Sequence, residues 1–149
     1  GLAQLAPDDV RAIAHYLVSL QTDRAATSAD ALLARSREQA RVLRGPAQRL
    51  FDAACGACHH DGDGPELTGL NAPLALNPNL HSARPDNLLR TILEGIQDPA
   101  FIEIGHMPAF RHALNDAQIA ELAAHMRQRF APGQAAWQDL AAAVGCGQH

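Results

Sequence analysis

The sequence predicts an all-α fold, and three observations carry that prediction. Apolar residues recur at helical spacing near the start of the chain, as in Val10, Ile13 and Leu17. Residues 31–44 are rich in Ala, Leu and Arg, which are among the best helix formers. No pair of alternating apolar and polar runs indicates two neighbouring strands. Because aromatic residues make up only 4% of the chain, we expect Leu, Ile and Ala to build most of the core.

The first part of the chain predicts three helices. One covers the apolar repeat from Val10 to Leu17, with Pro7 and two aspartates at its start. Residues 21–29 are polar and without pattern, as is typical of a linker. A second helix covers residues 31–44 and ends at Gly45-Pro46. A third, short helix covers residues 47–54 and leads directly into Cys55.

The remainder predicts two long loops and three helices. Residues 60–80 contain many Gly, Pro, Asn and Asp residues and are predicted to form a long loop, which in a compact domain is usually functional. A helix follows over Asp86–Gly95, and residues 98–112 form the second loop. Asn115 or Asp116 then caps a helix that runs to Phe130. The last short helix is predicted over residues 137–144.

One segment of the chain resembles another. Residues 5–17, LAPDDVRAIAHYL, align with residues 114–126, LNDAQIAELAAHM, so that apolar positions coincide. We therefore interpret the first helix as the last helix of a preceding copy of the same domain. The predicted organisation is a domain fragment over 1–20, a partly helical linker or spacer over 21–46, the domain itself over 47–131, and a tail with a short helix over 132–149.

Charge and cysteine content exclude some classes of function. The net charge is -4, and all twelve basic residues are arginines without a cluster, which argues against a nucleic-acid binder. We expect most of these arginines to be solvated. No apolar run reaches the length of a membrane span. The three cysteines are an odd number, and Cys146 lies alone near the C-terminus, so we expect an inert thiol there and no disulfide framework.

The sequence CGACH, from Cys55 to His59, carries the chemistry. The motif has two cysteines three positions apart, followed directly by a histidine. Such a motif occurs in redox dithiols, in half-sites for zinc and in haem anchors. A redox dithiol is normally found in a βαβ setting, and zinc needs four ligands at spacings that this chain does not offer. The haem interpretation is favoured: Cys55 and Cys58 form thioethers to the haem, and His59 ligates the iron.

A second axial ligand is predicted downstream. Met107 precedes Pro108 in a loop before the helix that ends at Phe130, and a thioether opposite an imidazole suits an electron carrier. His106 is the main rival for this position, and would give a bis-imidazole site. Met126 is instead expected to be a core residue.

Several motifs together resemble one known family. FDAACGACH, APLALNP, PDNLLRTILEGI and MPAFRHALNDAQIAELAAHMRQRF are similar to small bacterial cytochrome c domains with Met/His ligation. The branch they resemble comprises cytochrome subunits, typically with three haem domains, that serve periplasm-facing dehydrogenases. It includes subunits of alcohol and gluconate dehydrogenases and of molybdenum hydroxylases of the nicotinate and isoquinoline type. The tail FAPGQAAWQDLAAAV is most similar to the last group.

The resemblance implies further site residues. Pro73 matches the family proline whose carbonyl orients the proximal imidazole, and Phe51 matches the aromatic residue that packs the first domain helix on the last. Two positions depart from the family: Ala47 stands where glycine is usual at the helix crossing, and His125 stands where tyrosine is usual. Arg84 and Arg90 are candidates to pair with a haem propionate, and Trp137 is expected to pack the tail against the domain.

The function implied by the resemblance is one-electron transfer through one covalent haem c. The partners would be a dehydrogenase subunit, preceding haem domains of the same polypeptide, and a quinone or terminal oxidase of the respiratory chain. The location would be periplasmic, in possible association with the inner membrane. The alternatives are a haem-based sensor or gas-binding domain in which Met107 is labile, and a peroxidase-type enzyme with an open iron site.

Overall fold

A computed structural model describes residues 4–19, 28–60, 73–97 and 106–146. Within these ranges the chain forms helices and one two-residue bridge, between Ile96 and Met107, and no strand. The predicted all-α fold is confirmed. No helix in the described ranges has the length and apolar character needed to cross a membrane. The elements are α1 (Pro7–Ser19), α2 (Ala29–Val42), α3 (Pro46–Ala54), the 3₁₀ helix η2 (Leu74–Leu76), α4 (Pro78–His81), α5 (Asp86–Glu94), α6 (Asp116–Phe130) and α7 (Leu140–Cys146).

Local sequence explains where the main helices begin. The Ser28 side chain accepts a hydrogen bond from the Ala31 amide at 3.2 Å and caps α2. At the start of α6, Asn115 and Gln118 form a reciprocal capping box, in which each side chain bonds the backbone N–H of the other. Pro46 occupies the first turn of α3, where its missing N–H costs nothing.

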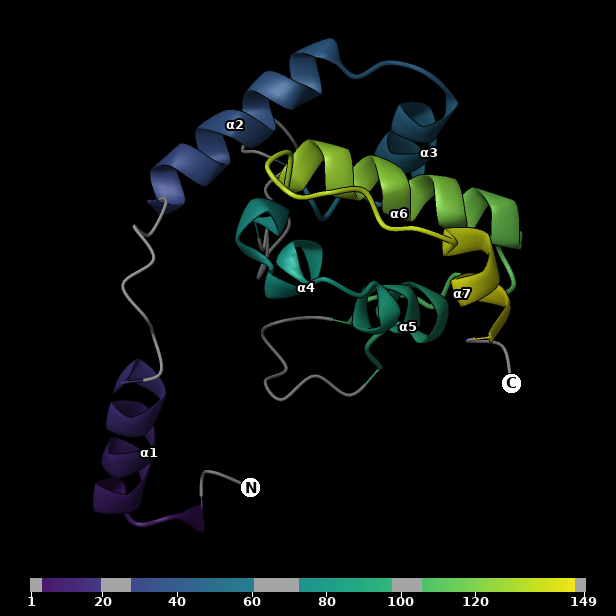
Figure 1. The fold of residues 1–149 in the computed structure, drawn as a ribbon. Coiled ribbons are helices and arrows are strands. Elements are labelled where there is room, and N and C mark those ends of the chain that lie inside the picture. The colour runs from purple at the N-terminus through teal and green to yellow at the C-terminus, as the bar shows by residue number, and fades with distance from the viewer. Residues whose placement is uncertain (1–3, 20–27, 61–72, 98–105, 147–149) are drawn as a thin grey trace.

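Helix α6 is the centre of the core. It packs against α2, α3, α4, α5 and α7, and Figure 1 shows it with α2 and α3 above and with α4 and α5 below. Ile119 and Leu122 on α6 are fully buried, and Met126 is 4% exposed, which confirms its predicted core role. Because burial of an apolar side chain stabilises by about 1.5–3 kcal/mol, this single face of α6 organises the fold.

Phe51 joins α3 to α6. Its ring lies 5.4 Å from the ring of Phe130 and 5.8 Å from that of His125, and the Arg129 guanidinium lies over it at 4.9 Å. The packing expected of Phe51 is therefore observed. Burial lowers the pKa of His125, and the charge of Arg129 lowers it further against an opposing effect of Asp52. At the position where the resemblance implies a tyrosine, this chain thus carries a buried, neutral imidazole.

The prediction of a loop over residues 60–80 is wrong for its last part. Residues 61–72 lie outside the described ranges, but η2 and α4 occupy most of 74–81. The Asn77 side chain accepts from the Asn79 amide, and Pro78 follows at the first helical position, so the Asn-Pro pair starts a helix. Leu74, Ala75 and Leu80 anchor these turns in the core. Of the second predicted loop, residues 106–112 are described and are not helical.

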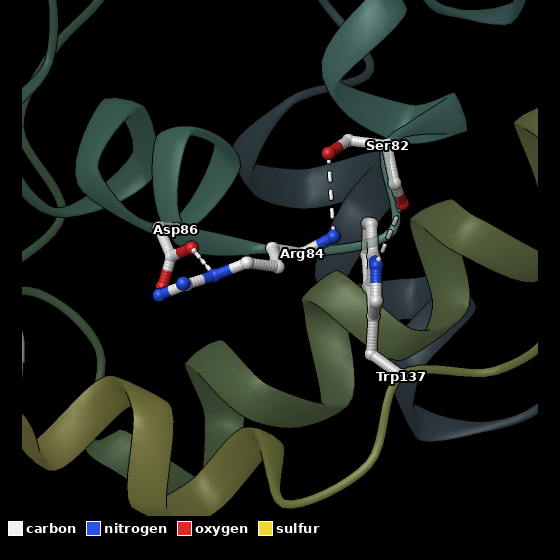
Figure 2. Close-up of polar contacts among 4 residues, drawn as sticks. All are labelled: Ser82, Arg84, Asp86 and Trp137. Atoms are coloured by element: carbon white, nitrogen blue, oxygen red, sulfur yellow. Dashed lines mark hydrogen bonds and ion pairs between the residues drawn. The ribbon is translucent and has the colours of Figure 1, made fainter.

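Two segments outside the predicted domain boundaries, α2 and the C-terminal tail, pack on the domain. Helix α2, interpreted as part of a linker, packs on α6 and buries Ser36 completely. In the tail, the Trp137 indole N–H donates to the Ser82 carbonyl at 3.1 Å (Figure 2), which confirms that Trp137 fixes the tail to the domain. Helix α7 begins at Leu140, three residues later than expected, because the chain from 131 to 139 is occupied by turns and by Trp137 packing.

Most of the described arginines are exposed, as expected, but two on α6 are buried. Arg127 and Arg129 are 4% and 5% exposed, respectively. The Arg127 guanidinium donates to the carbonyls of Leu80, Ser82 and Ala135 and stacks on Trp137 at 4.4 Å. The exposed Arg84 bonds the Asp86 carboxylate at 2.7 Å, as Figure 2 shows.

Candidate functional site

The cysteine motif forms a tight turn at the end of α3. The Cys55 amide donates to the Phe51 carbonyl at 2.8 Å, which continues the helical pattern past Ala54. The Cys55 carbonyl in turn accepts from the amides of Cys58 and His59, at 3.1 and 2.9 Å. Both cysteines and the histidine are therefore held on one hydrogen-bonded turn, which is fixed to the core through Phe51.

The two thiols lie in different environments. Cys55 is 7% exposed and belongs to the core, whereas Cys58 is exposed. Burial, with a smaller contribution from the neighbouring Cys58, raises the pKa of the Cys55 thiol to about 11. A catalytic or redox dithiol needs a thiolate and a lowered pKa. The buried Cys55 is therefore unsuited to be the attacking thiolate of a redox dithiol.

The imidazole of His59 is half-buried, and its Nδ1 atom is fully buried. Pro73, which the family resemblance pairs with this imidazole, stands at the start of η2, where its carbonyl accepts from the Leu76 amide at 3.0 Å. The orienting role of Pro73 stays a prediction.

Met107 is held by the backbone of Ile96, two residues after the end of α5. Its amide and carbonyl form a reciprocal pair with Ile96, at 3.0 and 2.9 Å. Three residues on, the Phe110 amide donates to the Ile92 carbonyl at 3.0 Å, which satisfies a free carbonyl at the end of α5. Met107 is half-buried against the core, whereas its neighbour and rival His106 is exposed. The geometry favours Met107 over His106 as a ligand facing the interior.

The donor set fits a haem c. Two thiols and an imidazole on one turn, and a thioether packed against the same core, are the groups that attach and ligate haem. Among the described residues, no three His, Cys, Asp or Glu side chains come together in the way a metal site requires. The zinc interpretation finds no ligand set there.

Arg84 and Arg90 are the candidates to pair with a haem propionate. Arg84 bonds Asp86, and Arg90 bonds Glu94 at 3.0 Å on the same helix. Both guanidiniums are thus paired with carboxylates of the chain itself.

An all-α domain that presents C-x-x-C-H at the end of α3 and a methionine on the loop before α6 is a cytochrome c domain. Residues 45–126 match the family described as cytochrome c oxidase, cbb3-type, subunit III, and the chain belongs to this family. Its function is accordingly haem-based electron transfer.

The comparison with curated proteins gives a closer relative. The chain is 47% identical over 140 residues to a segment of a nicotinate dehydrogenase subunit from Pseudomonas putida. The alignment covers 94% of this chain and 12% of that protein, so the chain spans about an eighth of the length of the relative. The predicted resemblance to a cytochrome subunit of a dehydrogenase is confirmed.

Two features, one at the site and one in the core, are not foreseen from the sequence. The sequence indicates Gly95 only as the end of a helix, and nothing in it pairs Ile96 with Met107. Arg127 carries no signal of burial, since it stands in an arginine-rich stretch of α6. Contacts between residues far apart in the sequence create both features.

Proposed function

We propose that this chain transfers one electron at a time through a single haem c, attached by thioethers to Cys55 and Cys58. His59 and Met107 would be the two axial ligands. The observation that carries the proposal is the hydrogen-bonded C-x-x-C-H turn at the end of α3, together with the placement of Met107 against the same core. The haem, when bound, supplies the Fe(III)/Fe(II) couple.

The chain's own residues would hold the group and close both axial positions. Thioethers from one turn prevent loss of the haem, and Phe51 fixes that turn to α6. Pro73 is proposed to orient the imidazole through its carbonyl, which would fix the tautomer and strengthen the ligand. Ligation by both His59 and Met107 would leave no iron position for a substrate, which would favour electron transfer over sensing or peroxidase chemistry.

Carbon monoxide binding tests this proposal against the sensor alternative. Reduced protein is expected to give a reversible one-electron potentiometric curve and an unchanged spectrum under carbon monoxide. A Met107→Leu variant is expected to bind carbon monoxide, whereas the matched core variant Met126→Leu is not. Carbon monoxide binding by the unmodified protein would favour the sensor with a labile methionine.

A dehydrogenase partner is proposed as the electron source. The support is the name of the relative, and the acceptor would be a quinone or terminal oxidase. Since thioether attachment takes place outside the cytoplasm, the proposed location is periplasmic, at or near the inner membrane. In the assembled complex, addition of nicotinate is expected to reduce this haem. Reduction by alcohol or gluconate instead would point to another dehydrogenase.

Helix α1 is proposed to close a separate cytochrome c domain, with 21–46 as the connection and 47–131 as the domain described here. Val10, Ile13 and Leu17 match Ile119, Leu122 and Met126 of α6, yet they are 41%, 39% and 56% exposed. Figure 1 shows α1 apart from the other helices.

In a longer protein that includes another such domain, polar substitutions on this face of α1 test the arrangement. They are expected to destabilise that domain and to leave the domain over 47–131 unchanged. If the substitutions leave the stability of the preceding domain unchanged, the proposed place of α1 in that domain is wrong.

A further inference from the structure

The backbone of Met107 passes directly against Gly95. A Cβ atom at residue 95 would meet three consecutive residues: it would overlap the carbonyl oxygen of Met107, and it would lie 2.8 Å from both the Pro108 carbonyl carbon and the Ala109 nitrogen. All three are backbone atoms, so no side chain can turn away to make room. Only glycine permits this close approach.

The approach coincides with the bonds that hold the methionine. Ile96, directly after Gly95, exchanges both of its backbone hydrogen bonds with Met107. The Gln97 side chain also donates to the Met107 carbonyl, at 3.4 Å. A shift of the Met107 backbone away from residue 95 would therefore lengthen the hydrogen bonds that hold this backbone, and with it the methionine side chain, in place.

We infer that Gly95 is the positioning residue for the distal ligand. Its missing side chain lets the 107–109 backbone lie on the end of α5, and the Ile96–Met107 bridge then fixes the methionine. This inference rests on the proposed ligation by Met107 and deepens it. Gly95 acts through the backbone of Met107.

A second glycine provides a matched control. Gly95 has φ 69° and ψ -168°, and Gly45 has φ 124° and ψ -169°, so both adopt a conformation that is nearly restricted to glycine. A Cβ at Gly45 would have no atom within 4 Å. Gly45→Ala therefore measures the backbone cost alone, whereas Gly95→Ala adds displacement of the Met107 segment.

The experiment measures the weak far-red sulfur-to-iron band of the oxidised holoprotein and its affinity for imidazole. We expect Gly95→Ala to keep its covalent haem, to lose most of the band, and to bind imidazole at least about tenfold more tightly, since each factor of ten corresponds to about 1.4 kcal/mol lost from the competing methionine bond. Gly45→Ala is expected to keep the band and the imidazole affinity of the unmodified protein.

Three outcomes would overturn the inference. If Met107→Leu loses the band but Gly95→Ala keeps both band and imidazole affinity, the inference fails and the ligand assignment stands. If Gly95→Ala and Gly45→Ala lose the band equally, general backbone cost explains the effect. If Met107→Leu keeps the band, the ligand assignment itself is wrong.

Hydrogen exchange of the unmodified holoprotein tests the inference even if Gly95→Ala does not fold. The amides of Ile96 and Met107 are expected to be protected to the same degree as those of α5. Exchange of both amides at the rate of an open peptide, with the band intact, would show that the bridge does not hold the ligand.

Discussion

The buried guanidinium of Arg127 joins three parts of the chain, and its removal gives the sharpest stability prediction. It lies on α6 and donates to Leu80 and Ser82 in and after α4, and to Ala135 in the tail at 3.0 Å. It also stacks on Trp137. The proposed change is Arg127→Met, because methionine fills a similar volume without donors.

The expected loss is about 3 kcal/mol. Hydrogen bonds to charged donors contribute about 1.5 kcal/mol or more each, and the stacking on Trp137 contributes about 1 kcal/mol. Burial of the guanidinium partly offsets this loss of stability. Burial removes the charge from water, which also lowers the pKa of Arg127. Replacement of the charged group by methionine therefore recovers about a few kcal/mol. The carbonyls left behind lose their donors, and the cost of this keeps the net effect destabilising.

Denaturant unfolding of the holoprotein measures this loss. The control is Arg41→Met, because Arg41 is exposed and reaches Glu38 only at 3.6 Å; a change below about 0.5 kcal/mol is expected there. A Trp137→Phe variant and the double variant complete a cycle, with an expected coupling of about 1 kcal/mol. An Arg127→Met protein as stable as the unmodified one would refute the reasoning.

Three further predictions concern the core and the cysteine turn. Phe51→Ala is expected to cost about 3–5 kcal/mol in urea unfolding, since the ring is 1% exposed; a loss below about 1 kcal/mol would contradict its role in joining α3 to α6. The lowered pKa of His125 means that the unfolded chain binds a proton more readily, so stability is expected to be complete above pH 6.5 and to fall as the pH drops below it. His125→Phe should flatten that profile, and an unchanged slope between pH 7 and 5 would contradict this. In haem-free protein, iodoacetamide is expected to label exposed Cys58 well before Cys55, whose labelling rate rises toward pH 11; equal rates near pH 8 would contradict the burial of Cys55.

Most helices are predicted correctly because the residues that start and end a helix lie within or next to it in the sequence. The capping residues of α6 and the glycine after α5 mark helix ends wherever the rest of the chain lies. The loop predicted over residues 60–80 is wrong at its end because that prediction rested on Gly, Pro, Asn and Asp content, although the Asn77-Pro78 pair starts a helix. The burial of Leu80 then holds that turn in place.

The candidate site was predictable in its chemistry and not in its support. The spacing of Cys55, Cys58 and His59 already favours a haem anchor, since that chemistry depends on residues close together in the sequence. The contact of Gly95 with the 107–109 backbone depends on how the chain returns to the end of α5. A single sequence carries no signal of such a return, and the same is true of the carbonyls around Arg127.

The central claim is one haem c bound covalently through Cys55 and Cys58, and the pyridine haemochrome of the denatured protein tests it most directly. Protein matured with the haem-attachment machinery is expected to show a c-type haemochrome, and acid-denatured protein is expected to have the mass of the chain plus one haem. Replacement of either cysteine by alanine should shift the absorption maximum of the haemochrome to that of a haem with one remaining thioether. Haem that is extracted by acidic solvent, or a chain mass without haem, would contradict the account.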